Sequence, residues 1–350
     1  MSRARNLADL LDSNGDVVSG ALDNVPPSND ASALTTGTLP VDRVPYVGRR
    51  NLIINGGFDV WQRGTSFTTT TAYTADRWHW SNGSAVTVSR TTFASTDNNP
   101  GGKYYLRIGA NSTSHSTSGV SLRYHIENVT SVAPNTSITL SYWIRSSEVT
   151  SWKSQVWERY NGWTDYAQLA SHTDTISSSW TKITQTFTTA ARTGKTIVDG
   201  ANTLTLQLQN NSAFTGTNTI DIANVQLEVG SVATPFEYRS YGEELALCQR
   251  YYQTGNPNMI AHVVNSGLLT LPIHPTVSFR ASPSVEFITS PYVENVPWNS
   301  VGSVTLSNTT AAHLTARGGE IGLFGSYSPT PSVGQVWLVN ASELKMAAEL

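Results

Sequence analysis

The chain has 350 residues, which allows two or three domains at roughly 100–200 residues each. Charged residues make up only 13% of the chain, against a usual value of about 25%, and this argues against long exposed helices. The 22 basic and 25 acidic residues give a formal net charge of -3, so we expect no basic field that would attract nucleic acid or an acidic membrane.

The first part of the chain favours a short element followed by an extended segment. Leu7, Leu10 and Leu11 have the spacing of a short helix or turn that ends at the Asn-Gly pair 14–15. Residues 20–45 contain several prolines and show no sustained apolar periodicity, so they bury too little apolar area to order on their own. Two interpretations stay open: a linker, or an arm that becomes ordered on a larger assembly.

From Asn51 onward, short runs rich in Val, Ile, Thr, Tyr and Trp alternate with turn residues, which is typical of an all-β sandwich. Trp78 and Trp80 are expected on one face of a strand, with Arg77 and His79 on the other. The Asn82-Gly83 pair predicts a hairpin. Period-two alternation predicts eight or nine strands before Gly230, enough for a double-sheet jelly roll; clear examples are residues 103–110, 119–129, 137–146, 180–189, 202–211 and 218–231.

A helix and a second set of strands follow. Residues 241–253 predict a helix, with Glu243 and Glu244 in the first turn and Leu245, Cys248 and Tyr252 on one face. After it, proline-punctuated short strands predict a small β domain. The predicted fold is therefore all-β, with four parts: an extended N-terminal arm (1–50), a jelly-roll β-sandwich (51–240), a short connecting helix (241–253) and a small C-terminal β domain that would form the distal tip (254–350).

The sequence carries few signals of catalysis or cofactor binding. The single cysteine, Cys248, excludes an internal disulfide framework and is expected to be a small buried side chain. No phosphate-binding loop, nucleophile elbow or dinucleotide fingerprint is present. The sequence shows no secretory signal and no apolar run of about 18 residues, so neither export by a signal peptide nor membrane insertion is expected.

Aromatic residues gather in residues 151–168, around a predicted Asn-Gly turn at 161–162. Alternation separates Trp157 from Glu158 and leaves Tyr160 or Trp163 near the turn, where an exposed ring could stack on a sugar. The candidate glycan-binding residues of this segment are Trp157, Tyr160, Trp163 and Asp165; the alternative is that the aromatic residues are core. Glu158 and Asp165 flank the turn, but without further cleft signals they predict no glycosidase, so a non-enzymatic protein is expected.

A second candidate glycan-binding group lies in the C-terminal domain. Tyr292 and Trp298 fall in a proline-bounded loop, where exposed aromatic residues are more common than in a strand. Packing in the core of a small domain is the alternative for both residues.

Three stretches together resemble phage and prophage structural proteins whose central module is a carbohydrate-binding jelly roll. They are NLIINGGFDVW (51–61), TADRW (74–78) and the segment from Thr219 to Tyr252. Residues 2–40 also resemble the start of tail-fibre-like proteins of marine phages. The matching positions of the jelly-roll pattern are Asn51, Leu52, Asn55, Gly56, Phe58 and Asp59 at its opening, and Asp221, Val225 and Leu227 at its close.

The resemblance implies that the chain is a virion protein, a tail-fibre or appendage subunit that adsorbs to host surface glycans. It implies a homotrimer, located on the phage tail or particle surface, whose arm docks on other virion proteins through apolar residues: Leu7, Leu10, Leu11, Val25, Leu34 and Leu39. A capsid fibre or decoration protein with a structural role stays open, as does, with less support, a polysaccharide-degrading enzyme.

The resemblance also bears on a metal ion, although no cofactor is otherwise expected. In such jelly rolls a Ca²⁺ ion can tie the first strand to the last, and Asp59 and Asp221 would be its ligands here. Ile222 stands where a second acidic residue is common, which removes one ligand.

Overall fold

The computed structural model describes residues 49–349 with several gaps, within a compact unit that spans Gly48–Leu350. The gaps are residues 96, 98–99, 112–113, 117–118, 256–258, 266–267, 274, 288–291, 296–300, 303–305, 311–318, 326–335 and 341–343. The six candidate docking residues of the N-terminal arm lie outside the described residues.

The described residues confirm the all-β prediction. Ten strands form one antiparallel sheet in the order β7-β6-β9-β4-β2-β3-β10-β5-β8, with β1 paired to β2. The strands are β1 Ser66–Tyr73, β2 Trp78–Thr92, β3 Tyr104–Gly109, β4 Ser121–Glu127, β5 Ser137–Ser146, β6 Ser151–Asn161, β7 Asp165–Thr175, β8 Thr181–Thr188, β9 Thr203–Asn210 and β10 Thr219–Val229. A single 3-10 turn, Val129–Ser131, follows β4.

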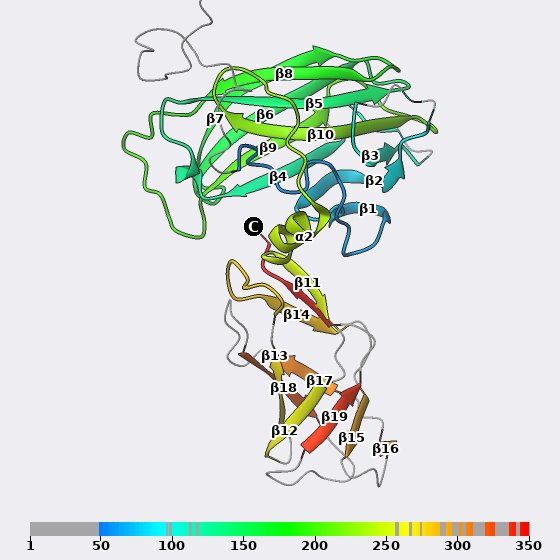
Figure 1. The fold of residues 1–350 in the computed structure, drawn as a ribbon, viewed down its shortest axis with the longest axis vertical. Coiled ribbons are helices and arrows are strands. Elements are labelled where there is room, and N and C mark those ends of the chain that lie inside the picture. Colours follow the sequence, from blue (N-terminus) through cyan, green and yellow to red (C-terminus); the bar gives the residue numbers. More distant parts are fainter. Residues whose placement is uncertain are drawn as a thin grey trace, which may run out of the picture. The chain divides into compact units, whose positions relative to one another are not determined.

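The long strand β2 turns this sheet into two layers. Its first residues, 78–81, pair with β4, and its last residues, 87–92, pair with β3. One layer therefore contains β7, β6, β9 and β4, and the other contains β3, β10, β5 and β8 (Figure 1). The apolar positions of the alternating strands fill the space between the layers, so the predicted period-two pattern defines the core.

The Asn82-Gly83 pair does not form the predicted hairpin. Strand β2 runs through it, and both halves of β2 pair with the same neighbour, β1. The register of that pairing jumps from Thr69–Val86 to Thr71–Ser81, so the additional residues are accommodated as an irregularity within one strand. The shared face of Trp78 and Trp80 is confirmed, because both are fully buried in the core. Arg77 precedes β2 with a positive φ of 75° and is itself buried, so it does not alternate with His79 as predicted.

The opening motif 51–61 is a structural connection to the last strand of the sandwich. The Asn51 side chain donates to the Val225 carbonyl and accepts from the Leu227 amide. A Cβ atom on Gly56 would lie 2.1 Å from the Val225 carbonyl oxygen, so only glycine fits there. Asn224 has a positive φ of 51° within a β-bulge, so Val225 and Leu227 face inward like Ile220 and Ile222.

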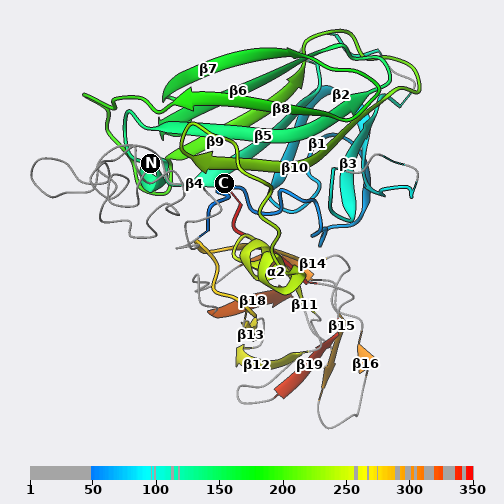
Figure 2. The same ribbon diagram turned by 45° about the horizontal axis from the view of Figure 1, so that its top comes forward.

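A connecting helix is confirmed as α2, Tyr241–Gln249, which follows an extended segment after β10 (Figure 2), but it is shorter than the predicted 241–253. Tyr252, which was expected on its apolar face, begins strand β11, Tyr252–Gly255, instead. Ser240 caps it by accepting from the Glu243 amide. Its buried face consists of Glu244, Leu247 and Cys248, whereas Leu245 is only half-buried. Burial raises the pKa of the Cys248 thiol, so this cysteine is the inert, buried residue that the sequence predicts.

Two further sheets follow α2, and all their strands pair antiparallel. The three-stranded sheet has the order β11-β20-β14, and the seven-stranded sheet has the order β16-β15-β19-β12-β13-β18-β17. Their strands are β11 Tyr252–Gly255, β12 Met259–Asn265, β13 Leu268–Ile273, β14 Ser284–Phe287, β15 Tyr292–Asn295, β16 Val301–Gly302, β17 Leu306–Thr310, β18 Gly319–Gly325, β19 Val336–Asn340 and β20 Leu344–Ala347.

The last residues of the chain return to the sandwich. The Ala348 amide donates to the Tyr251 carbonyl, and the Glu349 carboxylate pairs with Arg63 and Arg77. A distal position for the rest of residues 254–350 stays a prediction. Within the described part of the chain, no helix has the length and apolar character needed to cross a membrane.

Candidate functional site

Asp59 and Asp221, the expected calcium ligands, have other surroundings. Asp221 is buried, and its carboxylate accepts from Arg107 at 2.7 Å and from Arg145 at 2.9 Å. Two guanidinium groups thus occupy the positions that a cation would need, so the residues present do not fit a Ca²⁺ ion at Asp221. Asp59 is half-buried, and its burial raises the pKa of its carboxyl group, against the lowering effect of Lys103 and Arg90.

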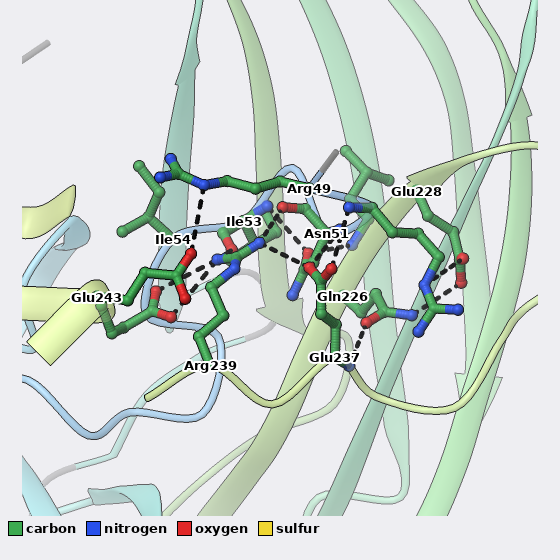
Figure 3. A network of polar contacts seen from close by, with 12 residues as sticks. Arg49, Asn51, Ile53, Ile54, Gln226, Glu228, Glu237, Arg239 and Glu243 are labelled. Atoms are coloured by element: carbon green, nitrogen blue, oxygen red, sulfur yellow. Dashed lines mark hydrogen bonds and ion pairs between the residues drawn. The ribbon is translucent and has the colours of Figure 1, made fainter. Parts of the chain in front are cut away.

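The tie between the opening segment and the end of the sandwich is made by Arg239 instead (Figure 3). Its buried guanidinium donates to the Ile53 and Asn51 carbonyls and to the Glu237 carboxylate, and it pairs with Glu244 at 3.4 Å. Four oxygen acceptors therefore surround one fixed cation, which connects the opening segment with the start of α2. The Nε of Arg239 is buried without an acceptor, but the contacts of its other two guanidinium nitrogens give the cluster a structural role.

The outer side of strands β7, β6, β9 and β4 carries polar and aromatic side chains, which we call the arginine–aromatic face. Val156, Leu206 and Tyr124 form one register row and point into the core. The next row, with Trp157, Thr205 and His125, therefore points outward. The outward positions of this face are occupied by Arg123, His125, Gln155, Trp157, Arg159, Tyr166, Thr205 and Gln207.

The turn between β6 and β7 adds Trp163 to this face. Gly162 has a φ of 56° and donates to the Ala201 carbonyl, which confirms the predicted Asn-Gly turn. Trp163 is 56% exposed, and its ring lies over the Arg159 guanidinium, with Arg123 5.5 Å from the ring centre. Tyr166 is 50% exposed and contacts the half-buried Trp157 edge to face. Three aromatic residues thus lie together beside two arginines.

Tyr160 does not belong to this face. Its side chain is fully buried, and its hydroxyl group donates to the Glu158 carboxylate at 2.7 Å. The two consecutive bulges of β6 against β7, near Trp157 and near Asn161, do not turn it outward. Of the two residues expected near the turn, Trp163 is exposed and Tyr160 lies in the core. The prediction that Tyr160 binds a glycan at the surface is therefore wrong.

The arginines of this face lack acidic partners among the described residues. Arg159 is 3% exposed and donates to the Thr205 hydroxyl group through Nε, but its Nη1 has no acceptor. Arg123 is partly exposed, makes no ion pair with the described residues, and has an unpartnered Nε. Burial and the nearby charge of Arg123 lower the pKa of Arg159 to about 10. The face therefore carries positive charge that the described residues do not neutralise.

The histidines beside these arginines stay uncharged at neutral pH. Burial lowers the pKa of His125 to about 3, and the charges of Arg77, Arg159 and Arg123 act in the same direction. Burial and Arg123 also lower the pKa of His79. Since His125 Nδ1 lies 3.0 Å from the Thr205 hydroxyl group, it continues the polar row across β4 and β9.

Glu158 and Asp165 do not form a pair of catalytic carboxylates. Glu158 is fully buried and accepts from Arg192 at 2.6 Å, on the core side of β6. Asp165 lies at the start of β7 and accepts from Lys195 at 2.6 Å. Each carboxylate has its own cation, and Glu158 is closed to a substrate. Asp165 is close to the turn that carries Trp163, but its carboxylate forms an ion pair with Lys195.

A hollow of about 560 Å³ lies beside β1, and it is lined by Phe67 and Tyr73 together with residues of β11, β14 and β20. The Arg63 guanidinium lies 3.6 Å from the centre of the Tyr252 ring and pairs with Glu349. Because Arg63 has an acidic partner at this hollow, the charge pattern does not point to a ligand there.

The remaining candidate residues are placed differently. Tyr292 begins strand β15, so it lies in a strand rather than in the predicted loop, and Trp298 falls outside the described residues. The aromatic cluster of residues 151–168 did not indicate Arg123, His125 and Gln207, which β4 and β9 contribute to the face. The alternation in residues 121–127 and 203–209 could have indicated these positions, since Arg, His, Thr and Gln alternate there with core residues.

In the described part of the chain, no cluster of three or more His, Cys, Asp or Glu side chains could hold a metal ion. Among the described residues, the histidines therefore add no metal site to the arginine–aromatic face.

No family model and no curated protein matches the chain. Several solved structures do. A xylan-binding domain from Paenibacillus barcinonensis has 17% identity and a TM-score of 0.30, with 48% of this chain and 94% of that chain covered. A carbohydrate-binding module in complex with β-1,4-galactotriose has 13% identity and a TM-score of 0.30, with 52% and 100% covered. The enzymatically active domain of a tailspike protein of bacteriophage CBA120 has 14% identity and a TM-score of 0.28, with 51% and 21% covered.

Proposed function

We propose that the chain is a non-enzymatic glycan-binding protein and that the arginine–aromatic face is its binding site. The observation that carries this proposal is the position of Trp163 and Tyr166, two half-exposed rings on the same face as the outward amides of Gln155 and Gln207 on β6 and β9. Exposed rings stack on the apolar faces of sugars, and side-chain amides and arginines bind sugar hydroxyl groups. A rigid sheet holds both kinds of group in one place.

Two features support binding without catalysis. The carboxylates nearest the face, Glu158 and Asp165, are each neutralised by a cation, and Glu158 is fully buried. A glycosidase needs two available carboxylates on either side of the scissile bond. Neither residue meets that requirement, so we propose recognition rather than hydrolysis.

Replacing Trp163 by Ala tests the proposal. We expect glycan binding to weaken about five- to tenfold, because a stacked aromatic ring contributes roughly 1–1.5 kcal/mol to binding. The measurement is binding of the purified chain to an array of surface glycans and to intact bacterial cells, with the parent protein beside it.

Tyr241→Ala is the matched control for this variant, because Tyr241 is 60% exposed but lies on α2. The control should bind like the parent. If Trp163→Ala also binds like the parent while circular dichroism shows a folded chain, the arginine–aromatic face is not the site. If the parent itself binds no glycan, the proposed function fails.

We also propose that the chain is a virion appendage subunit, a homotrimer whose N-terminal arm attaches it to the phage particle. The support is the resemblance of residues 2–40 to the start of tail-fibre-like proteins and of residues 51–61 to the opening of phage-associated jelly rolls. Several weak glycan sites in a trimer would bind together with higher avidity than one site. Detection of the chain in purified particles, and its loss when the first 46 residues are deleted, tests this role.

A capsid fibre or decoration protein with a structural role is the alternative that the same resemblance supports. It predicts incorporation into particles without measurable glycan binding. The glycan measurements above therefore separate it from an adsorption protein.

A further inference from the structure

The charges of the arginine–aromatic face indicate more than binding to a neutral sugar. Arg123 on β4 and Arg159 on β6 lie on either side of β9 and approach the same ring, that of Trp163. Lys153 lies further along the same side of β6, opposite Gln209. Cationic side chains from two strands thus gather on one side of one layer.

The acidic groups around this face are engaged elsewhere. Glu127, at the end of β4, accepts from the Tyr251 hydroxyl group and pairs with Arg250 and Arg280. Asp165 pairs with Lys195, and Glu158 pairs with Arg192 on the core side. None of these carboxylates forms an ion pair with Arg123 or Arg159 among the described residues. The two guanidinium groups are therefore left with the ring of Trp163 as a shared neighbour.

A buried guanidinium without an anion is costly, because its desolvation is not repaid by an ion pair. Stacking with Trp163 and the bond to Thr205 recover part of this cost, but Nη1 of Arg159 and Nε of Arg123 remain without acceptors. Those two atoms are closed to solvent, so a ligand with anionic oxygens would contact the partly exposed end of the Arg123 guanidinium and feel the charge of Arg159.

The opposite layer shows how this chain neutralises arginines that serve the fold. Arg107 and Arg145 lie beside the aromatic residues Tyr105 and Trp180, and both donate to the Asp221 carboxylate. Asp97 adds a second acceptor for Arg145. The arginine–aromatic face has a similar combination of arginine and aromatic side chains but lacks the aspartate.

We propose that the glycan bound at this face is anionic, a saccharide whose carboxylate or sulfate group contacts Arg123 while its ring stacks on the exposed side of Trp163. Arg159 beneath the ring adds positive charge. This inference rests on the proposed function and specifies the class of ligand. Uronic acid and sulfated sugars share the chemistry that the face requires, and the two sources can be distinguished by experiment.

The test compares two matched pairs of polymers, with binding to the full chain measured by biolayer interferometry. Polygalacturonate and its fully methyl-esterified form differ only in the carboxylate, and dextran sulfate and dextran differ only in the sulfate. We expect the parent protein to bind at least one anionic polymer about tenfold or more tightly than its neutral partner, because a hydrogen bond to a charged group is worth about 1.5–3 kcal/mol. The anionic polymer that binds more tightly shows whether the face recognises a carboxylate or a sulfate group.

Arg123→Gln should remove this preference and leave any binding to the neutral polymers unchanged. Arg107→Gln is the matched control, since it removes an equivalent charge beside an aromatic ring on the opposite layer. The inference is overturned if Arg107→Gln weakens anionic binding as much as Arg123→Gln, because the preference then reflects total charge. It is also overturned if the parent binds neutral and anionic partners equally, in which case the proposed function survives. Binding to neither class, together with no binding on the glycan array, contradicts the proposed function itself.

Discussion

The two outer faces of the sandwich both combine arginines with aromatic side chains, but the arginines have different partners on each face. On the layer with β3, β10 and β5, Arg107 and Arg145 converge on Asp221, and aromatic rings cover the ion pairs. On the layer with β6, β9 and β4, Arg123 and Arg159 converge on Trp163, and no described carboxylate pairs with them. The first arrangement is complete within the fold, whereas the arginines of the second have no acidic partner among the described residues.

The comparison predicts which face the fold depends on. Removing the acceptor from the first face should be costly, because it leaves two guanidinium groups unpaired. Removing a cation from the second face should cost little, because that cation has no anion to lose. The following three changes test this difference in order of expected size.

Asp221→Asn makes the first face resemble the second and should have the largest effect. We expect a loss of about 2–3 kcal/mol in the free energy of unfolding, since the buried carboxylate accepts from both Arg107 and Arg145. Urea unfolding followed by tryptophan fluorescence measures it. Asp199→Asn, at an exposed position, should change the free energy by less than about 0.5 kcal/mol. Equal effects of the two variants would mean that Asp221 does not hold the first face together.

Acidic pH should destabilise the second face through His125. Its pKa in the folded state is about 3, so folded His125 stays neutral while the unfolded chain binds a proton below pH 6.5. Stability from this residue is therefore complete above about pH 6.5 and is lost as the pH falls towards 3. We expect a decrease of about 1–2 kcal/mol between pH 6.5 and pH 5.

His125→Gln is the variant that isolates this effect. It should flatten the pH dependence of the unfolding free energy over the same interval, and His79 should account for part of the slope that remains, since its pKa is also lowered. A variant whose pH profile overlays that of the parent would show that His125 does not titrate with folding.

Arg159→Met should have the smallest effect on stability. The substitution keeps much of the buried side-chain volume and removes a cation that has no anionic partner among the described residues, so we expect a change of less than about 1 kcal/mol. The same urea unfolding experiment measures it. A loss of 3 kcal/mol or more would show that Arg159 is a structural residue, and the contrast between the two faces would then disappear.

Much of the architecture could be predicted because it follows from local pattern. Alternation in residues 119–129 and 202–211 placed Leu122 and Leu206 in the core, and the glutamates in the first turn of 241–253 indicated a helix. The Asn82-Gly83 hairpin failed because turn propensity is local, whereas β1 pairs along both halves of β2. The expected calcium site failed for a similar reason: the partners of Asp221 come from β3 and β5, far away in the sequence.

The candidate site was predictable only in its aromatic part. The cluster around 151–168 is continuous in sequence, so its composition pointed to Trp163. Its burial pattern was less accessible, because Tyr160 and Trp163 are only three residues apart. Tyr160 continues the inward alternation of β6, whereas Trp163 lies in the turn after the strand ends. The contribution of Arg123 required knowing that β4 lies beside β9 and that β9 lies beside β6.

The all-β class, the sandwich core, the connecting helix and the burial of Cys248 follow from the amino-acid sequence, because they depend on periodicity and local propensity. The pairing of charges depends instead on which strands lie side by side in the folded chain. Asp221 meets Arg107 and Arg145, and Arg239 meets the Asn51 and Ile53 carbonyls, through strand order and not through sequence distance. The same strand order gathers Arg123, Arg159 and Trp163 on one face without a described carboxylate partner, because the sheet places β4, β9 and β6 side by side and directs these side chains outward.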